Sequence, residues 1–144
     1  DIGFAYDGDA DRCIAVDHTG RIINGDLILY VASLFLKQKE ELPKDTIVMT
    51  VMSNMGVQVA LKKQGINYSI TDVGDKNVAL RMQEEGYMLG GEQSGHVIFA
   101  KHASTGDGIL TSLKIMEAII ESKKSLHDIV KDVKEYPQLH ENIE

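Results

Sequence analysis

The segment 46–52, with the sequence TIVMTVM, is the feature that most limits how this chain can fold. It is a nearly continuous β-prone run that lacks the alternation of polar and apolar residues seen in a half-buried strand. Such a strand is buried on both faces, as in a parallel sheet. Helical patterns lie on both sides of it, at residues 27–39 and 75–85. Strands that alternate with helices predict a three-layer α/β domain with a mainly parallel, mixed sheet.

The remaining patterns divide the chain into expected strands and helices. Strands are predicted at 2–6, 13–17, 22–23, 46–52, 66–70, 87–89 and 97–99. Helices are predicted at 27–39, after a Ser53 cap up to Gly65, at 75–85, from 105 or 107 onward, and after a Ser125 cap. The fourth helix carries one apolar stripe, made of Ile109, Leu113, Met116 and Ile120. Beyond residues 136–137 the chain is polar, and we expect it to be frayed.

Length and charge narrow the class of protein. The 144 residues correspond to one domain, at roughly 150 residues per domain. With 15 basic against 22 acidic side chains, the net charge of −7 speaks against a nucleic-acid or anionic-membrane partner. The single cysteine, Cys13, fits a reducing, cytoplasmic location. The chain opens at Asp1 inside an apparent strand and without Met, so we expect it to be a piece of a longer protein.

Three carboxylates lie within five residues in the segment 7–12, with the sequence DGDADR. Asp7, Asp9 and Asp11 repel one another at the end of a predicted strand, and the small residues between them let all three turn to one point. Oxygen-only ligands favour a hard divalent ion, Mg²⁺ or Ca²⁺. Arg12 beside them is a candidate contact for a phosphate.

Other interpretations of this segment differ in how well they fit. A solvated acidic turn remains open. An EF-hand loop needs Gly and Glu where this chain has Arg12 and His18, and is rejected. A haloacid-dehalogenase-type phosphotransferase usually has Thr or Val at the place of Asp11 and a later Asp at the place of Ala79, so it fits poorly.

The second polar cluster is the segment 91–96, with the sequence GEQSGH. Glu92, Ser94 and His96 occupy alternate positions and would point to one side of an extended loop. A carboxylate beside a hydroxyl suits vicinal sugar hydroxyls, since the carboxylate accepts from two O–H groups while serine donates or accepts. An ordinary hairpin turn with exposed polar residues is the alternative, and His96 taken alone is the weakest candidate.

Together, the two segments resemble the α-D-phosphohexomutase superfamily. The segments 105–109 (TGDGI) and 51–56 (VMSNMG) fit the same superfamily. Gln93 and the segment 51–54 resemble its bacterial phosphoglucosamine mutase branch in particular, because phosphoglucomutase and phosphomannomutase relatives more often carry Met at position 93. The resemblance implies that residues 1–24 end the superfamily's second domain and that residues 25–144 form its third.

The resemblance also implies an activity. Members of this branch interconvert glucosamine-6-phosphate and glucosamine-1-phosphate through a phosphoserine and a bisphosphate intermediate, on the route to UDP-N-acetylglucosamine and the cell wall. Mg²⁺ would be held by the phosphoserine together with Asp7, Asp9 and Asp11, and Arg12 would stabilise the transferring group. The implied substrate-binding residues are Glu92, Ser94, His96 and Lys76.

Two parts of the superfamily's machinery have no counterpart in this sequence: the catalytic serine motif and the Arg-rich phosphate-binding loop. The expected partners are therefore a phosphorylated hexosamine and the remaining domains of the same polypeptide, and the isolated chain is expected to be inactive. Ala10 replaces the usual Gly, and its methyl group is not expected to disturb metal ligation. A phosphoglucomutase or phosphomannomutase, and a non-catalytic metal- or sugar-binding module, are the alternatives.

Overall fold

The computed structural model describes residues 1–141, which form two sheets and the helices that pack against them. The elements are β1 (Gly3–Tyr6), β2 (Cys13–Val16), β3 (Ile22–Ile23), α1 (Gly25–Gln38), a 3₁₀ turn (Pro43–Asp45), β4 (Thr46–Thr50), α2 (Met55–Lys63), β5 (Asn67–Thr71), α3 (Asp75–Glu85), β6 (Leu89–Gly91), β7 (Val97–Phe99), α4 (Gly108–Ser122) and α5 (Leu126–Val130). Within residues 1–141, no helix combines the length and apolar character that crossing a membrane requires.

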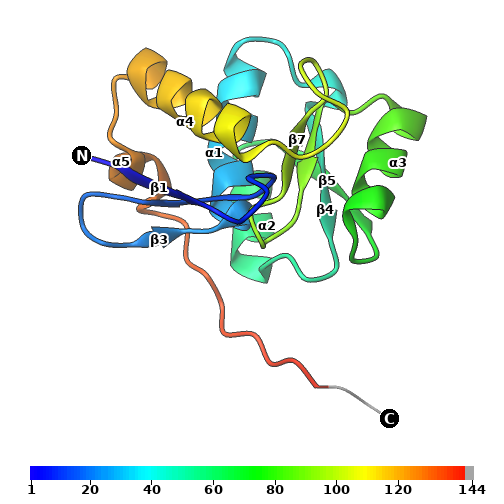
Figure 1. Ribbon diagram of the computed structural model, residues 1–144, viewed down its shortest axis with the longest axis horizontal. Helices are drawn as coiled ribbons and strands as arrows, with labels where there is room; N and C mark the ends of the chain where they lie inside the picture. Colours follow the sequence, from blue (N-terminus) through cyan, green and yellow to red (C-terminus); the bar gives the residue numbers. More distant parts are fainter. Residues whose placement is uncertain (142–144) are drawn as a thin grey trace.

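The larger sheet has the strand order β5-β4-β6-β7. Strand β4 runs parallel to β5 and β6, and β7 is antiparallel to β6. All five residues of β4 are buried, as its unbroken β-prone sequence predicts. The predicted extension of this strand to residue 52 is wrong, because the chain turns after Thr50 and Val51 is exposed. Helices α1 and α2 cover one face of the sheet and α3 covers the other (Figure 1). The predicted three-layer α/β fold with a mainly parallel, mixed sheet is therefore confirmed.

Helix α1 lies at the centre of the hydrophobic core. Its residues Leu27, Ile28 and Leu29 have no exposed surface, because the helix is enclosed by the larger sheet, α4 and the N-terminal strands. A second, smaller cluster lies between the sheet and α3 and contains Val48 and Val78. The larger sheet, which carries the loop before α3 at the end of β5, is thus fixed by packing on both of its faces.

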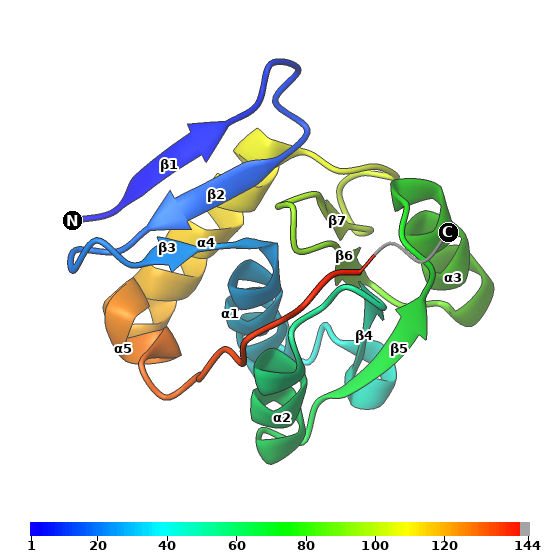
Figure 2. The same cartoon turned by 90° about the horizontal axis from the view of Figure 1, so that it is seen from below.

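The N-terminal strands form the second sheet, in which β1, β2 and β3 are antiparallel. Figure 2 shows this sheet lying beside α4 and the start of α1. The Tyr6 hydroxyl donates a hydrogen bond of 2.7 Å to Ser112 Oγ on α4. Residues 1–24 therefore pack against α1 and α4. Their assignment to a separate domain stays a prediction.

The prediction that Ser53 caps α2 is wrong. Asn54 is the cap: its side-chain Oδ1 accepts a 2.9 Å hydrogen bond from the Gly56 N–H. The expected fraying beyond residues 136–137 is also wrong at Gln138, whose side chain accepts a 3.2 Å hydrogen bond from Asn54 Nδ2 and donates one of 3.0 Å to the Met52 carbonyl. The first difference is a shift of the cap by one residue, whereas the second comes from a long-range contact that the local sequence does not reveal.

The apolar stripe of α4 is not the face that packs on the core. Ile109, Leu113 and Ile120 are 56%, 54% and 74% exposed. The buried face instead carries Ile115, which has no exposed surface, together with the small residues Ser112 and Ala118. Because apolar residues lie on both faces of this helix, hydrophobicity alone does not determine which face packs on the core.

Candidate functional site

The acidic loop (residues 7–12) and the glycine-flanked loop (residues 91–96) lie side by side, although some eighty residues separate them in the sequence. Arg12 and His96 form an antiparallel β-bridge. Next to it, the Cys13 N–H donates a 3.1 Å hydrogen bond to the Gly95 carbonyl. The structure thus unites the two polar clusters that the sequence singles out in a single candidate site.

The acidic loop presents a set of oxygens suited to a cation. One carboxylate oxygen from each of Asp7, Asp9 and Asp11 lies within 4.8 Å of the other two. Asp11 Oδ1 is buried and has no hydrogen-bond partner among the described residues. Since buried polar atoms are normally paired, this atom fits a role as a ligand. Oxygen-only donors at this spacing fit the predicted hard divalent ion, Mg²⁺.

The two carboxylates at the ends of this cluster differ in their pKa. Burial works to raise the pKa of Asp7, but hydrogen bonding from the Arg12 backbone and the charge of its guanidinium bring that pKa below its usual value. Burial and the neighbouring Asp7 and Asp9 raise the pKa of Asp11. Crowded negative charge therefore penalises ionisation of Asp11, and a bound cation would relieve that penalty.

The backbone of the acidic loop is itself constrained. Ala10 has a φ of +57°, in the left-handed region that favours glycine. Its N–H donates to the Asp7 carbonyl at 3.1 Å, and its carbonyl accepts from Gly108 N–H at 2.9 Å. The second bond joins the acidic loop to the start of α4, within the segment 105–109. Ala10 thus has a conformational cost in this loop, which the sequence alone did not predict.

The glycine-flanked loop is seated on the first turn of α1. The Gly25 N–H donates a 3.0 Å hydrogen bond to the Gln93 carbonyl. A side chain at position 25 would place its Cβ 1.9 Å from the Glu92 carbonyl oxygen, so the close approach requires glycine. The loop closes on itself through a 2.9 Å bond from the Glu92 N–H to the His96 carbonyl. Its backbone is therefore fixed before any ligand binds.

The Glu92 carboxylate is oriented by the loop before α3. Its Oε1 accepts a 3.0 Å hydrogen bond from the Gly74 N–H. Gly74 has a φ of +128°, a backbone conformation that other residues rarely adopt. Lys76 lies two residues further on, exposed in the first turn of α3. The loop before α3 thus links Glu92 to the segment that carries Lys76.

His96 and Ser94 occupy different environments. His96 is 3% exposed, and its Nε2 lies 3.7 Å from Asp11 Oδ2. Its Nδ1 has no hydrogen-bond partner among the described residues. Ser94 is exposed at the tip of the glycine-flanked loop. The imidazole therefore faces the acidic loop, and the predicted contacts of His96, Ser94, Glu92 and Lys76 with a sugar phosphate stay predictions.

Sequence reasoning missed Asp26, in the first turn of α1. This carboxylate is fully buried beneath the glycine-flanked loop, and its Oδ2 accepts hydrogen bonds from the Asn54 N–H at 2.7 Å and the Gln93 amide at 3.3 Å. Burial raises its pKa. An acidic residue in the first turn of a helix is ordinarily explained by the helix dipole, so the sequence offered no sign of this second role.

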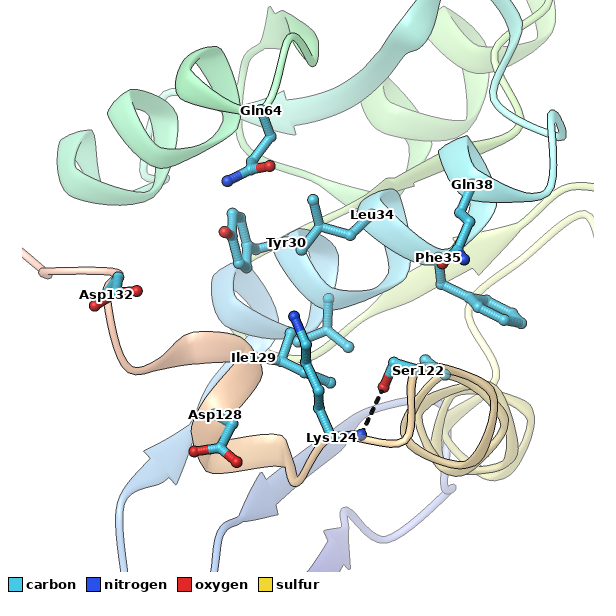
Figure 3. Close-up of a pocket in the computed structure, with 12 residues that line it drawn as sticks. Tyr30, Leu34, Phe35, Gln38, Gln64, Ser122, Lys124, Asp128, Ile129 and Asp132 are labelled. Atoms are coloured by element: carbon cyan, nitrogen blue, oxygen red, sulfur yellow. Dashed lines mark hydrogen bonds between the residues drawn. The ribbon is translucent and has the colours of Figure 1, made fainter.

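A separate hollow lies on the other side of α1 and does not include the candidate site. Figure 3 shows its lining, which comes from α1, the C-terminal end of α2, and the region of α4 and α5, and includes Tyr30, Gln64 and Asp132. None of the eight predicted site residues lines it, and all eight lie in the part of the chain that the structure describes. The candidate site is accordingly a surface formed by paired loops.

Comparison with known proteins agrees with the resemblance seen in the sequence. A phosphoglucosamine mutase from Lachnoclostridium phytofermentans is 54% identical over 143 residues, which is 99% of this chain and 32% of that protein. A phosphoglucosamine mutase from Streptomyces coelicolor is 48% identical over the same shares. This chain thus spans about a third of the length of these relatives.

The structural comparison also finds members of the phosphohexomutase superfamily. A crystal structure of a phosphoglucomutase/phosphomannomutase family protein from Burkholderia thailandensis superposes with a TM-score of 0.78 at 27% identity, and the match covers 93% of this chain and 29% of that one. The family model described as phosphoglucomutase/phosphomannomutase, alpha/beta/alpha domain III, matches residues 24–136. The chain therefore belongs to the phosphoglucomutase/phosphomannomutase family, within the phosphohexomutase superfamily.

Proposed function

We propose that this chain supplies the metal-binding and sugar-binding loops of a phosphoglucosamine mutase. The observation that carries the proposal is the pairing of the acidic loop with the glycine-flanked loop through Arg12 and His96. It sets a cluster of carboxylates beside an oriented carboxylate, Glu92. The names of relatives with 54% and 48% identity support glucosamine as the sugar. The cytoplasmic location inferred from the sequence belongs to the same proposal.

In this proposal the acidic loop serves phosphoryl transfer. Asp7, Asp9 and Asp11 would hold Mg²⁺, which supplies positive charge near a transferring phosphoryl group when it is bound. Arg12 lies beside these carboxylates with its side chain 53% exposed, so its guanidinium is accessible to a phosphate. The phosphoserine that donates the phosphoryl group would come from another part of the polypeptide.

The glycine-flanked loop would hold the sugar. Glu92 and Ser94 would bind vicinal hydroxyls, with Lys76 and His96 nearby. The sugar must bind in two orientations, one for each phosphate. Turning a glucose-type ring over exchanges its 3- and 4-hydroxyls, so a carboxylate that bridges this pair serves both orientations. The hydrogen bond from the Gly74 N–H already orients the Glu92 side chain, so binding of the sugar would cost little further conformational entropy of this side chain.

The proposal is tested with the longer protein that carries this chain. Purified with Mg²⁺, it should convert glucosamine-6-phosphate into glucosamine-1-phosphate with a higher kcat/KM than it shows for glucose or mannose phosphates. A preference for glucose or mannose phosphate would support a phosphoglucomutase or phosphomannomutase instead. Absence of turnover with all three sugars, in a protein whose serine motif is intact, would favour a non-catalytic binding module.

A matched pair of variants tests the metal-binding role. Asp9→Asn removes one charge from the acidic loop at nearly constant shape, and it should lower kcat strongly while leaving the circular dichroism spectrum unchanged. Asp132→Asn changes an exposed carboxylate outside the candidate site and should leave kcat unchanged. Equal activity of the Asp9→Asn variant and the unmodified protein at limiting Mg²⁺ would remove Asp9 from the ligand set.

A further inference from the structure

The side chain of Gln93 is held on the inner side of the glycine-flanked loop. Its Nε2 donates to Asp26 Oδ2 at 3.3 Å and to Gln138 Oε1 at 3.1 Å. Its backbone carbonyl is held by the Gly25 N–H. With both its main chain and its side chain anchored in this way, Gln93 ties the middle of the loop to the body of the domain.

The carboxylate of Asp26 connects two segments that are distant in the sequence. It is fully buried and accepts hydrogen bonds from the Asn54 backbone and from the Gln93 side chain. Gln93 and the segment 51–54 are the features by which the sequence resembles one branch of its superfamily, and the fold brings them to the same carboxylate. A buried carboxylate needs such donors, since leaving it unpaired is costly.

Gln138 belongs to a strap, which we define as residues 134–138. Asn54 holds the strap through its Nδ2, which donates to the Tyr136 carbonyl at 2.8 Å, and through its Oδ1, which accepts from the Tyr136 N–H at 2.9 Å. Gln138 Nε2 donates to the Met52 carbonyl at 3.0 Å. Figure 2 shows this segment crossing from α5 past α1 and α2 toward β6.

We infer that Gln93 is a positioning residue for Glu92 and Ser94, and that the strap forms part of the support of the sugar-binding loop. Residues 92–95 form a tight turn, which a 3.0 Å hydrogen bond from the Gly95 N–H to the Glu92 carbonyl closes. Within this turn the Gln93 side chain contacts Asp26 and Gln138. The Glu92 carboxylate has a different partner, the Gly74 N–H. Gln93 does not bind the sugar itself. It fixes the loop against Asp26 and Gln138, so displacement of the strap loosens the loop. The consequence for activity rests on the proposed function.

Hydrogen exchange of the full-length protein tests the physical coupling without an activity assay. Gln138→Met keeps side-chain length but removes its polar contacts. It should raise amide exchange in residues 92–96 about two- to tenfold, in keeping with the loss of ordinary hydrogen bonds. Gln93→Met should raise exchange in residues 134–138 to a similar degree. Gln83→Met, on the exposed side of α3, should change neither segment. Unchanged exchange in residues 92–96 of the Gln138→Met protein would overturn the inference.

Kinetics of the same variants test the positioning role. Each single change should lower kcat/KM for glucosamine-6-phosphate about two- to tenfold, and the double variant should lose less than the product of the two losses, because both changes break one network. Multiplicative losses would show that Gln93 does not act through Gln138. If the unmodified protein does not convert glucosamine-6-phosphate, the proposed function fails, while the exchange test of the coupling still stands.

Discussion

Ala10 adopts a left-handed backbone in the middle of the acidic loop, with a φ of +57°. An L-residue with a Cβ is strained there, whereas glycine is not. Ala10→Gly should therefore raise the free energy of unfolding by about 0.5–1 kcal/mol, after the greater unfolded-state freedom of glycine is subtracted.

Urea unfolding followed by circular dichroism measures this change. Ala79→Gly, in the interior of α3, is the matched control and should destabilise by about 1 kcal/mol, because a helix interior disfavours glycine. Destabilisation by both substitutions would show that the left-handed conformation of Ala10 carries no strain.

Asp17 fixes the turn between β2 and β3. Its Oδ1 accepts hydrogen bonds from the Thr19 N–H, the Thr19 hydroxyl and the Arg21 N–H, at 2.9, 2.6 and 3.1 Å. Burial alone would raise the pKa of Asp17, but these bonds outweigh it and lower the pKa to about 2. The folded state therefore favours the ionised carboxylate.

The sign of the pH dependence follows from this lowered pKa. The stabilisation is complete above the ordinary pKa of about 3.9 and is lost as the pH falls toward 2. At pH 7 Asp17→Asn should lower the free energy of unfolding by roughly 2 kcal/mol, and the difference from the unmodified protein should shrink between about pH 4 and pH 2. Urea unfolding at a series of pH values checks this. A difference that stays constant down to pH 2 would contradict it.

At the scale of elements, the contact between the glycine-flanked loop and the first turn of α1 leaves no room for a side chain at Gly25. In Gly25→Ala the added Cβ would meet the Glu92 carbonyl oxygen at 1.9 Å, so the loop must move. Overpacking of this kind costs about 1–3 kcal/mol of stability. We expect a loss of that size in urea unfolding. Gly8→Ala is the control, since no atom lies within 4 Å of the added methyl group and stability should barely change. Equal stability of the two variants would show that the loop can move freely.

The sequence predicts those elements of the fold whose burial depends on their own residues, and it fails where burial depends on distant partners. Strand β4 and helix α3 were predicted from periodicity and composition, because their burial follows from their own residues. The orientation of α4 was not, since the exposed Ile109 and Ile120 and the fully buried Ile115 lie on different faces of the same helix. Periodicity locates a helix but does not show which stripe finds a closely fitting partner.

In the candidate site, too, the local pattern was predicted from the sequence and the long-range contacts were not. Carboxylate spacing in the acidic loop predicted a cation cluster, and the oxygens of Asp7, Asp9 and Asp11 do converge. That this loop lies beside His96 was not predicted, because pairing across some eighty residues leaves no periodic pattern. The role of Asp26 was missed for the same reason: its partners Asn54 and Gln93 are 28 and 67 residues away in the sequence.

At the scale of the whole molecule, the proposed function implies that this chain supplies only part of a metal site. Mg²⁺ requires about six oxygens in octahedral array, and in the proposed enzyme one of them comes from a serine phosphate elsewhere in the polypeptide. Three carboxylates without that partner should bind Mg²⁺ weakly. Titration calorimetry of this chain should show heat that is lost in Asp9→Asn and kept in Asp132→Asn. A dissociation constant well below micromolar would contradict this account of the site.

The central claim is that the glycine-flanked loop holds the sugar of a phosphohexomutase substrate. The most direct test is kcat/KM for glucosamine-6-phosphate in the full-length protein with Glu92→Ala, beside Glu84→Ala on the exposed face of α3 as control. Hydrogen bonds to a charged acceptor are worth about 1.5–3 kcal/mol each, so Glu92→Ala should lower kcat/KM about tenfold to a hundredfold or more. Glu84→Ala should leave it unchanged. If Glu92→Ala changes neither kcat/KM nor the affinity for a glucose-type bisphosphate, the sugar-binding role of this loop is wrong.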